Sequence, residues 1–143
     1  MSTSRTSVFI ALAAGIAACG SLIAAQAPRT VWAGVYTEAQ AVRGKQAYID
    51  NCASCHGEGL QGADLAPALK VEDFLLRWSA QPVHGLATAI AKTMPLTAPG
   101  SLSDALNADI TAYVLQVNKF PAGKTELPSD EAGLKSIDLT LEK

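Results

Sequence analysis

Residues 52–56 read Cys-Ala-Ser-Cys-His, and no other segment constrains this chain as strongly. A C-x-x-C-H run is typical of covalent attachment of a c-type haem, in which two thiols bond the porphyrin and the histidine ligates the iron. Five consecutive residues then supply three bonds, so the haem cannot dissociate. The motif predicts one covalent haem c, with Cys52 and Cys55 as thioether residues and His56 as an iron ligand.

Two other chemistries use cysteines at this spacing. A thioredoxin-like redox pair requires a strand–helix context, and half of a zinc site requires a second Cys/His pair elsewhere in the chain. The only further cysteine is Cys19, near the N-terminus, and the only further histidine is His84. This shortage of partners favours haem attachment.

The sixth iron ligand separates electron transfer from catalysis. Apart from the initiator, Met94 is the only methionine, and Pro95 follows it. A thioether is a weak ligand that raises the reduction potential of haem iron, and a proline stiffens the segment that carries it. The sequence predicts Met94 as the axial ligand. The alternatives are a methionine that fills a gap in the core and ligation by His84.

Residues 1–27 are predicted to form a secretory signal peptide, because Arg5 precedes an apolar run over residues 8–25. Cleavage after Ala25 or Ala27 fits this pattern. Export agrees with the haem motif, since bacterial c-type haems are attached outside the cytoplasm. We therefore expect a periplasmic protein.

Two alternatives for the N-terminus would place the protein on a membrane. Residues 16–19 (Ile-Ala-Ala-Cys) resemble a lipobox, in which Cys19 would become an acylated N-terminus. The apolar run is also long enough to serve as an uncleaved anchor. Membrane association through the N-terminus therefore stays open at this point.

Composition argues for one small domain behind the targeting segment. The 143 residues are 49% hydrophobic and 17% charged, with 11 Lys and Arg against 13 Asp and Glu. The resulting negative net charge argues against nucleic-acid binding. It also leaves no broad lysine ring, so we expect a docking face that is local or partly apolar.

Helical spacing and capping patterns predict an all-α domain of about four to five helices. The first helix is expected from Thr37 to about Asn51, with Thr37 and Gln40 as a capping box and Gly44 at a close helix contact. The other expected helices cover residues 71–78, residues 82–93 with Pro82 in the first turn, and a last helix from Ser101 or Ser103 to about residue 119. Persistent strand-like alternation is absent from the sequence.

This reading divides the chain into residues 1–27 as the signal, 28–36 as an N-terminal lead-in, 37–121 as the domain and 122–143 as a C-terminal tail. Four apolar residues of the tail are candidates to pack on the domain, namely Leu127, Leu134, Ile137 and Leu139.

In this order, the helix, C-x-x-C-H, Pro-x-Leu, Met-Pro and closing helix resemble a class I cytochrome c over about residues 37–121. The resemblance implies a fold around one haem in which the first and last helices cross at Gly44 and Tyr113. It also implies that the carbonyl of Pro67 accepts a hydrogen bond from the ligand imidazole. Leu69 would lie beside the haem, and Trp78 would lie near a propionate.

Three shorter segments, residues 31–36, 99–103 and 120–123, resemble small bacterial cytochromes that accompany periplasmic quinoprotein dehydrogenases. The resemblance implies an electron carrier, not an enzyme, with a dehydrogenase as donor and a cytochrome or oxidase as acceptor. One alternative is a haem peroxidase or gas-binding protein with a labile sixth ligand. Another is a membrane-anchoring subunit of a larger redox complex.

Overall fold

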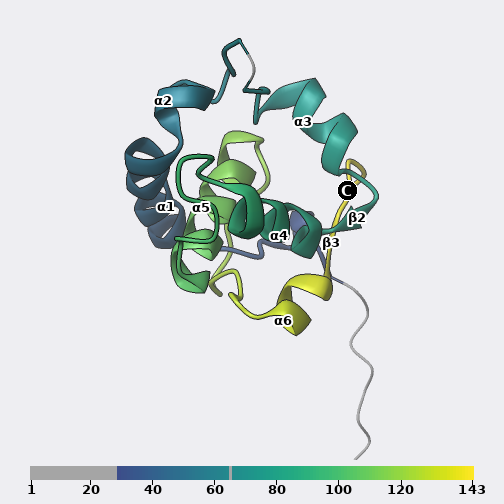
Figure 1. Cartoon of the computed structure of the whole chain (residues 1–143). Helices are drawn as coiled ribbons and strands as arrows, with labels where there is room; N and C mark the ends of the chain where they lie inside the picture. The colour runs from purple at the N-terminus through teal and green to yellow at the C-terminus, as the bar shows by residue number, and fades with distance from the viewer. Residues whose placement is uncertain (1–28, 65) are drawn as a thin grey trace, which may run out of the picture.

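The computed structural model describes residues 29–64 and 66–143, so the predicted signal peptide and Cys19 lie outside the described residues. Six α-helices dominate this part of the chain (Figure 1), which confirms the predicted class. They exceed the expected four to five because α2 and α6 are single turns, too short to give a helical period. The helices are α1 (Glu38–Asn51), α2 (Ala53–His56), α3 (Val71–Trp78), α4 (Val83–Thr93), α5 (Asp104–Val117) and α6 (Glu131–Lys135).

Helix α1 begins where the capping pattern predicts. The Thr37 hydroxyl accepts a hydrogen bond from the backbone N–H of Gln40 at 3.1 Å. The second half of the predicted capping box is wrong, because the Gln40 side chain does not return to the cap. It exchanges two hydrogen bonds with the backbone of Leu127, at 3.1 Å and 2.6 Å. A buried amide gains more from two backbone partners than from one exposed cap.

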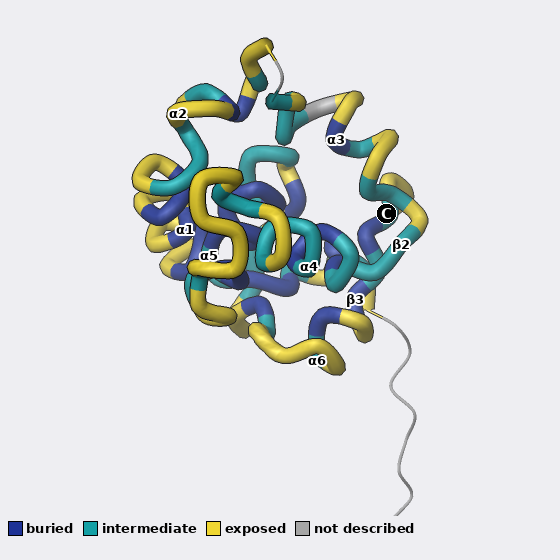
Figure 2. The backbone as a smooth tube through the Cα atoms, in the orientation of Figure 1, coloured by how far each residue is buried: buried dark blue, intermediate teal, exposed yellow. Residues whose placement is uncertain are grey.

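Helices α1 and α5 cross at Gly44. A Cβ atom at this position would lie 1.8 Å from the backbone oxygen of Asp109 and 3.0 Å from the Cβ of Tyr113. The rings of Tyr48 and Tyr113 meet beside the crossing, with centroids 5.5 Å apart. The crossing at Gly44 and Tyr113 is therefore present, and the facing sides of both helices are buried (Figure 2).

One helix start agrees with a predicted alternative, and another differs from the prediction by one residue. Ser103, and not Ser101, caps α5, because its hydroxyl accepts from the N–H of Leu106 at 3.2 Å. Pro82 precedes α4 as its extended cap residue and does not lie in the first turn. A proline gives the same sequence signal at the cap and in the first turn. Both positions accept its fixed φ, and neither requires its missing N–H for a bond within the helix.

A small sheet joins three segments that are distant in sequence. Strand β3 (Ile137–Leu139) pairs in parallel with β1 (Arg29–Thr30) and in antiparallel with β2 (Gln81–Pro82). Strands of two or three residues cannot show alternation, which is why none was predicted. The lead-in also contains the 3-10 helix η1 (Val31–Ala33).

The C-terminal segment packs against the helices. Leu127, Leu134, Ile137 and Leu139 are all buried, and Gly123 donates to the carbonyl of Tyr36 at 2.6 Å. Figure 1 shows α6 at the end of the molecule opposite α2 and α3. In the described residues, we find no helix with the length and apolar character needed to span a membrane.

Candidate haem-binding site

The Cys-Ala-Ser-Cys-His segment forms one helical turn directly after α1. Cys52 ends α1, with its N–H donating to the carbonyl of Tyr48 at 2.8 Å, and the N–H of His56 returns to the carbonyl of Cys52 at 2.9 Å. Cys52 is half-buried and Cys55 is exposed. Residues three apart on a helical turn lie on the same side, so the two sulfurs can reach one planar group.

His56 is held in a single tautomer. The residue is 7% exposed, and its Nδ1 lies 2.8 Å from the carbonyl oxygen of Pro67. A carbonyl only accepts hydrogen bonds, so Nδ1 must carry the proton and donate it. The lone pair of a neutral imidazole is then on Nε2, where a metal can bind. The contact is the one that the resemblance implies for Pro67.

The surroundings of the two cysteines bear on the alternative redox and zinc chemistries. Burial, followed by the neighbouring Cys55, raises the pKa of the Cys52 thiol to about 11. A raised pKa makes Cys52 a poor nucleophile. Across residues 29–64 and 66–143, no group of three His, Cys, Asp or Glu side chains could hold a metal ion, as a zinc site would need.

The loop after the motif is pinned at both ends. The N–H of Leu69 donates to the carbonyl of Leu60 at 2.9 Å, and the amide of Asn118 donates to the carbonyl of Leu69 at 3.0 Å. Leu69 itself is half-buried against the core. Sequence reasoning missed Leu60 and Asn118, because their contribution here is to a backbone geometry that no short motif encodes.

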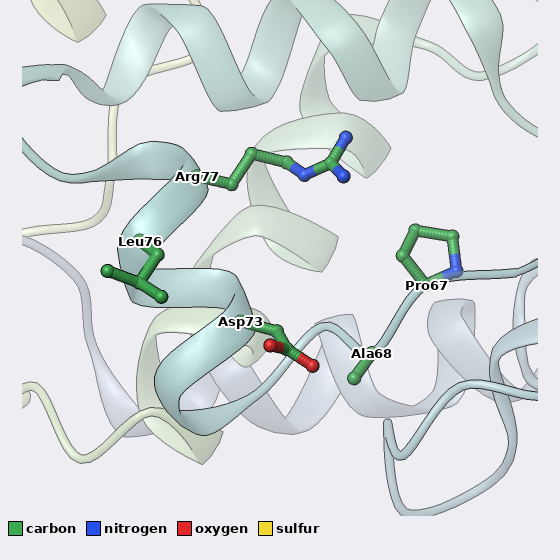
Figure 3. A pocket seen from close by; sticks show the side chains of 5 residues that line it. All are labelled: Pro67, Ala68, Asp73, Leu76 and Arg77. Carbon is green, nitrogen blue, oxygen red and sulfur yellow. The ribbon is translucent and has the colours of Figure 1, made fainter.

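A cavity of about 520 Å³ opens between this loop and α3 (Figure 3). This volume is within the range of about 300–1,000 Å³ that is usual for ligand-binding clefts. Figure 3 shows Arg77 and Asp73 extending from α3 toward the segment that carries Pro67. The cavity is lined by Pro67, Ala68, Asp73, Leu76 and Arg77.

Arg77 is a further residue that the sequence analysis missed. In the part of the chain that the structure describes, its guanidinium forms no ion pair, although Asp73 is one turn away. An unpaired guanidinium beside a cavity suits a ligand with a carboxylate. Two thiols and an oriented imidazole are the donor set that a haem c needs. Arg77 is a cation suited to the anionic propionates of such a group.

Trp78 and Met94 come from other elements. Trp78 ends α3 and packs, half-buried, against the core. Met94 is the cap residue at which α4 ends. Its backbone is extended, and its N–H donates a hydrogen bond to the carbonyl of Ile90 at 3.0 Å. Within the described residues, no hydrogen bond or ring contact joins either side chain to His56, so their predicted roles stay predictions.

His84, the alternative ligand, contacts a different region. Its Nε2 lies 3.2 Å from the hydroxyl of Thr88 and 3.9 Å from the carboxylate of Glu131 on α6. Helix α6 lies at the other end of the molecule from α2 (Figure 1). The contacts of His84 therefore favour a role between α4 and α6.

Comparison with known proteins agrees with this site. The family described as cytochrome c oxidase, cbb3-type, subunit III matches residues 39–114. A cbb3-type cytochrome c oxidase subunit, FixPc, of Rhizobium leguminosarum bv. viciae is 36% identical over 81 residues, which are 50% of this chain and 25% of that protein. A thiosulfate dehydrogenase of Stutzerimonas stutzeri is 39% identical over 80 residues, again 50% of this chain and 25% of that protein.

A solved structure is also similar. The sulfane dehydrogenase SoxCD of Paracoccus pantotrophus aligns with a TM-score of 0.54 and 25% sequence identity, over 69% of this chain and 52% of that chain. The chain spans about a quarter of the length of the curated relatives that it matches. The motif, the site geometry and the family match agree: this chain belongs to the family of cytochrome c oxidase, cbb3-type, subunit III, and is a c-type cytochrome that carries haem c.

Proposed function

We propose that this cytochrome is an exported carrier of single electrons, which takes them from a dehydrogenase and gives them to a downstream cytochrome or oxidase. The observation that carries this proposal is the bond between His56 Nδ1 and the Pro67 carbonyl, at 2.8 Å. It fixes a strong axial imidazole in a mostly buried position. A permanently ligated iron needs little rearrangement on reduction, which suits transfer and not catalysis.

Each site residue has a separate task in this proposal. Cys52 and Cys55 would hold the porphyrin through thioether bonds, and His56 and Met94 would supply the two protein ligands of the iron. Haem c supplies the iron that accepts and releases one electron. Met94 favours the ferrous state, while the hydrogen bond on His56 strengthens the imidazole and favours the ferric state. The balance of these two ligands sets the potential.

The cavity wall would hold the haem periphery. Arg77 is the charged group on α3 that could neutralise a propionate, and Trp78, next to it in sequence, could donate its ring N–H. Leu69 would pack beside the porphyrin. These assignments follow from the cavity lining for Arg77 and from the family resemblance for Trp78 and Leu69.

The partners are proposed from chemistry and from the relatives. The two relatives named as dehydrogenases support a dehydrogenase donor, and the oxidase subunit supports an oxidase as acceptor. A quinoprotein dehydrogenase is our specific proposal for the donor. Residues 94–103 carry no charge, and Leu96 within them is 74% exposed. We propose that this segment forms the apolar part of the docking face.

Replacing Met94 by alanine tests the assignment as a carrier. We expect the haem to stay covalently attached, the reduction potential to fall, and the iron to bind carbon monoxide or cyanide, because the soft sixth ligand is gone. Potentiometry and ligand-binding spectra of the wild type and the variant measure both effects. His84→Ala is the control and should leave the potential and ligand binding as in the wild type.

The same measurements address the alternative of a peroxidase or gas-binding protein. Such a protein needs an open or labile sixth site with acid–base groups beside it. Rapid binding of carbon monoxide by the wild type would support that alternative and reject Met94 as a permanent ligand. If His84→Ala, and not Met94→Ala, changes the reduction potential and opens the sixth site to ligands, the iron is ligated by two histidines.

Intact-mass spectrometry of the native protein tests the proposed location. We expect most of the mature chain to begin near Gln26 or Pro28 and to be soluble in the periplasm. Stable lipid anchoring requires more than one acyl chain, so a lipoprotein would show the added mass of several chains on Cys19. That mass, or a mass that retains residues 1–25, would replace the soluble assignment with a membrane-bound one.

A further inference from the structure

The hydroxyl group of Tyr48 is buried next to the haem motif. Tyr48 is fully buried, and its hydroxyl donates to the carbonyl of Gly57 at 2.6 Å. Burial raises the pKa of this phenol well above its ordinary value, so the group stays a donor at physiological pH. Phenylalanine would fill the same space. The hydroxyl therefore has its effect through Gly57, the residue that follows His56.

The carbonyl of Gly57 anchors a tight turn. It also accepts the N–H of Leu60 at 3.0 Å, and the carbonyl of His56 accepts the N–H of Gly62 at 2.9 Å. Gly57 has a φ of +74°, and Leu60, which is fully buried, has a φ of +58°. A leucine adopts this left-handed region only where its surroundings hold it there. The turn thus depends on external contacts.

The turn controls where the Pro67 carbonyl lies. The carbonyl of Leu60 accepts the N–H of Leu69 at 2.9 Å, two residues beyond Pro67. At this far end, the amide of Asn118 donates to the carbonyl of Leu69 at 3.0 Å. The loop is thus anchored by a side chain of α1 at one end and by a side chain that follows α5 at the other. Between the two anchors lies the bond from Pro67 to His56.

We infer that Tyr48 is a positioning residue for His56: its hydroxyl holds the loop that aims the Pro67 carbonyl at the imidazole. Through this loop, the α1–α5 crossing determines how strongly His56 is polarised. The inference rests on the proposed role of His56 as an iron ligand. It extends that role to a group that is not itself a predicted iron ligand or a thioether residue.

Tyr48→Phe tests the inference, with Tyr113→Phe as the matched control. Both variants remove one hydroxyl from the same ring pair, and the Tyr113 hydroxyl makes no hydrogen bond within the described residues. For Tyr48→Phe we expect the His56 Nδ1 proton and the Gly62 amide to exchange with solvent about two- to tenfold faster. This is the size of effect expected when one hydrogen bond is lost. The reduction potential should rise, since a weaker bond to Pro67 leaves a less electron-rich imidazole.

A purely structural role gives a different pattern. If the hydroxyl only stabilised the fold, the amide of Ala112, which is buried in α5, would accelerate by the same factor as the loop, and the potential would stay unchanged. That pattern overturns the inference, as does a Tyr48→Phe variant that behaves like Tyr113→Phe. Asn118→Ala cuts the other anchor and should give the same loop-specific exchange and upward shift in potential.

The nuclear magnetic resonance spectrum of the ferric wild type separates failure of this inference from failure of the proposed function. A paramagnetically shifted His56 ring shows that His56 ligates the iron. If the ring is shifted but Tyr48→Phe leaves it and the potential unchanged, only the positioning role is wrong. If the ring is not shifted in the wild type, the ligand assignment is wrong as well.

Discussion

A chain in which Cys52 and Cys55 are both replaced by alanine is expected to hold no covalent haem and to lose most of its cooperative fold. The residues around the motif would lose the group that they are predicted to pack against. Small domains bury too little apolar surface to tolerate such a loss, and many depend on a covalent or metal staple. His56 would also lose the partner of its Nε2 atom.

Denaturing mass spectrometry and far-ultraviolet circular dichroism measure these two losses. Ser54→Ala is the control within the same motif, because Ser54 is exposed and both thiols remain. The control should carry haem and unfold as the wild type does. A double variant without haem that still unfolds in a sharp transition would show that the helices form an independent core and would contradict the prediction.

The second large effect is expected at the helix crossing. Gly44→Ala should lower the free energy of unfolding by about 1–3 kcal/mol, the usual range for overpacking, even though alanine is the better helix former. The reason is that the new Cβ would lie 1.8 Å from the backbone oxygen of Asp109, and a backbone atom cannot rotate away. Helices α1 and α5 would have to separate.

Gly85→Ala in α4 is the matched control. A Cβ at Gly85 meets the end of the flexible Gln81 side chain, at 2.6 Å, which can move aside. This variant should be neutral or more stable by up to about 1 kcal/mol, the difference in helix propensity. Thermal unfolding followed by circular dichroism compares the two. Equal melting temperatures for the Gly44 and Gly85 variants would mean that the crossing is not tightly packed.

Local sequence signals located most of the helices and the centre of the site. The Cys-x-x-Cys-His spacing, the Thr37 cap and the apolar periodicity are properties of a few neighbouring residues, so they can be read without a fold. Residues 71–78 form a helix with the predicted bounds. A close helix contact at Gly44 was also predicted from a local cue, because a glycine in a helix has a cost that a close contact offsets. Tyr113 as the facing residue followed from the family resemblance.

Tertiary structure decided what the polar side chains do. Gln40 stands at the capping-box position after Thr37, yet its side chain binds the backbone of Leu127, because the C-terminal segment passes over α1. Tyr48 is an aromatic core residue by pattern, and its hydroxyl contact with Gly57 depends on how the turn after His56 folds back. The sheet of β1, β2 and β3 joins three segments whose pairing no short window contains.

The difference between what the sequence predicted and what the tertiary structure decided has one physical origin. The residues that attach the haem are consecutive, so their spacing alone determined the cofactor of this protein and one of its predicted iron ligands. The orientation of that ligand depends on hydrogen bonds between segments that are distant in sequence, namely His56 with Pro67 and Asn118 with Leu69. Such contacts depend on how the folded chain brings these segments together, so the chemistry was readable from the sequence and its tuning was decided by the fold.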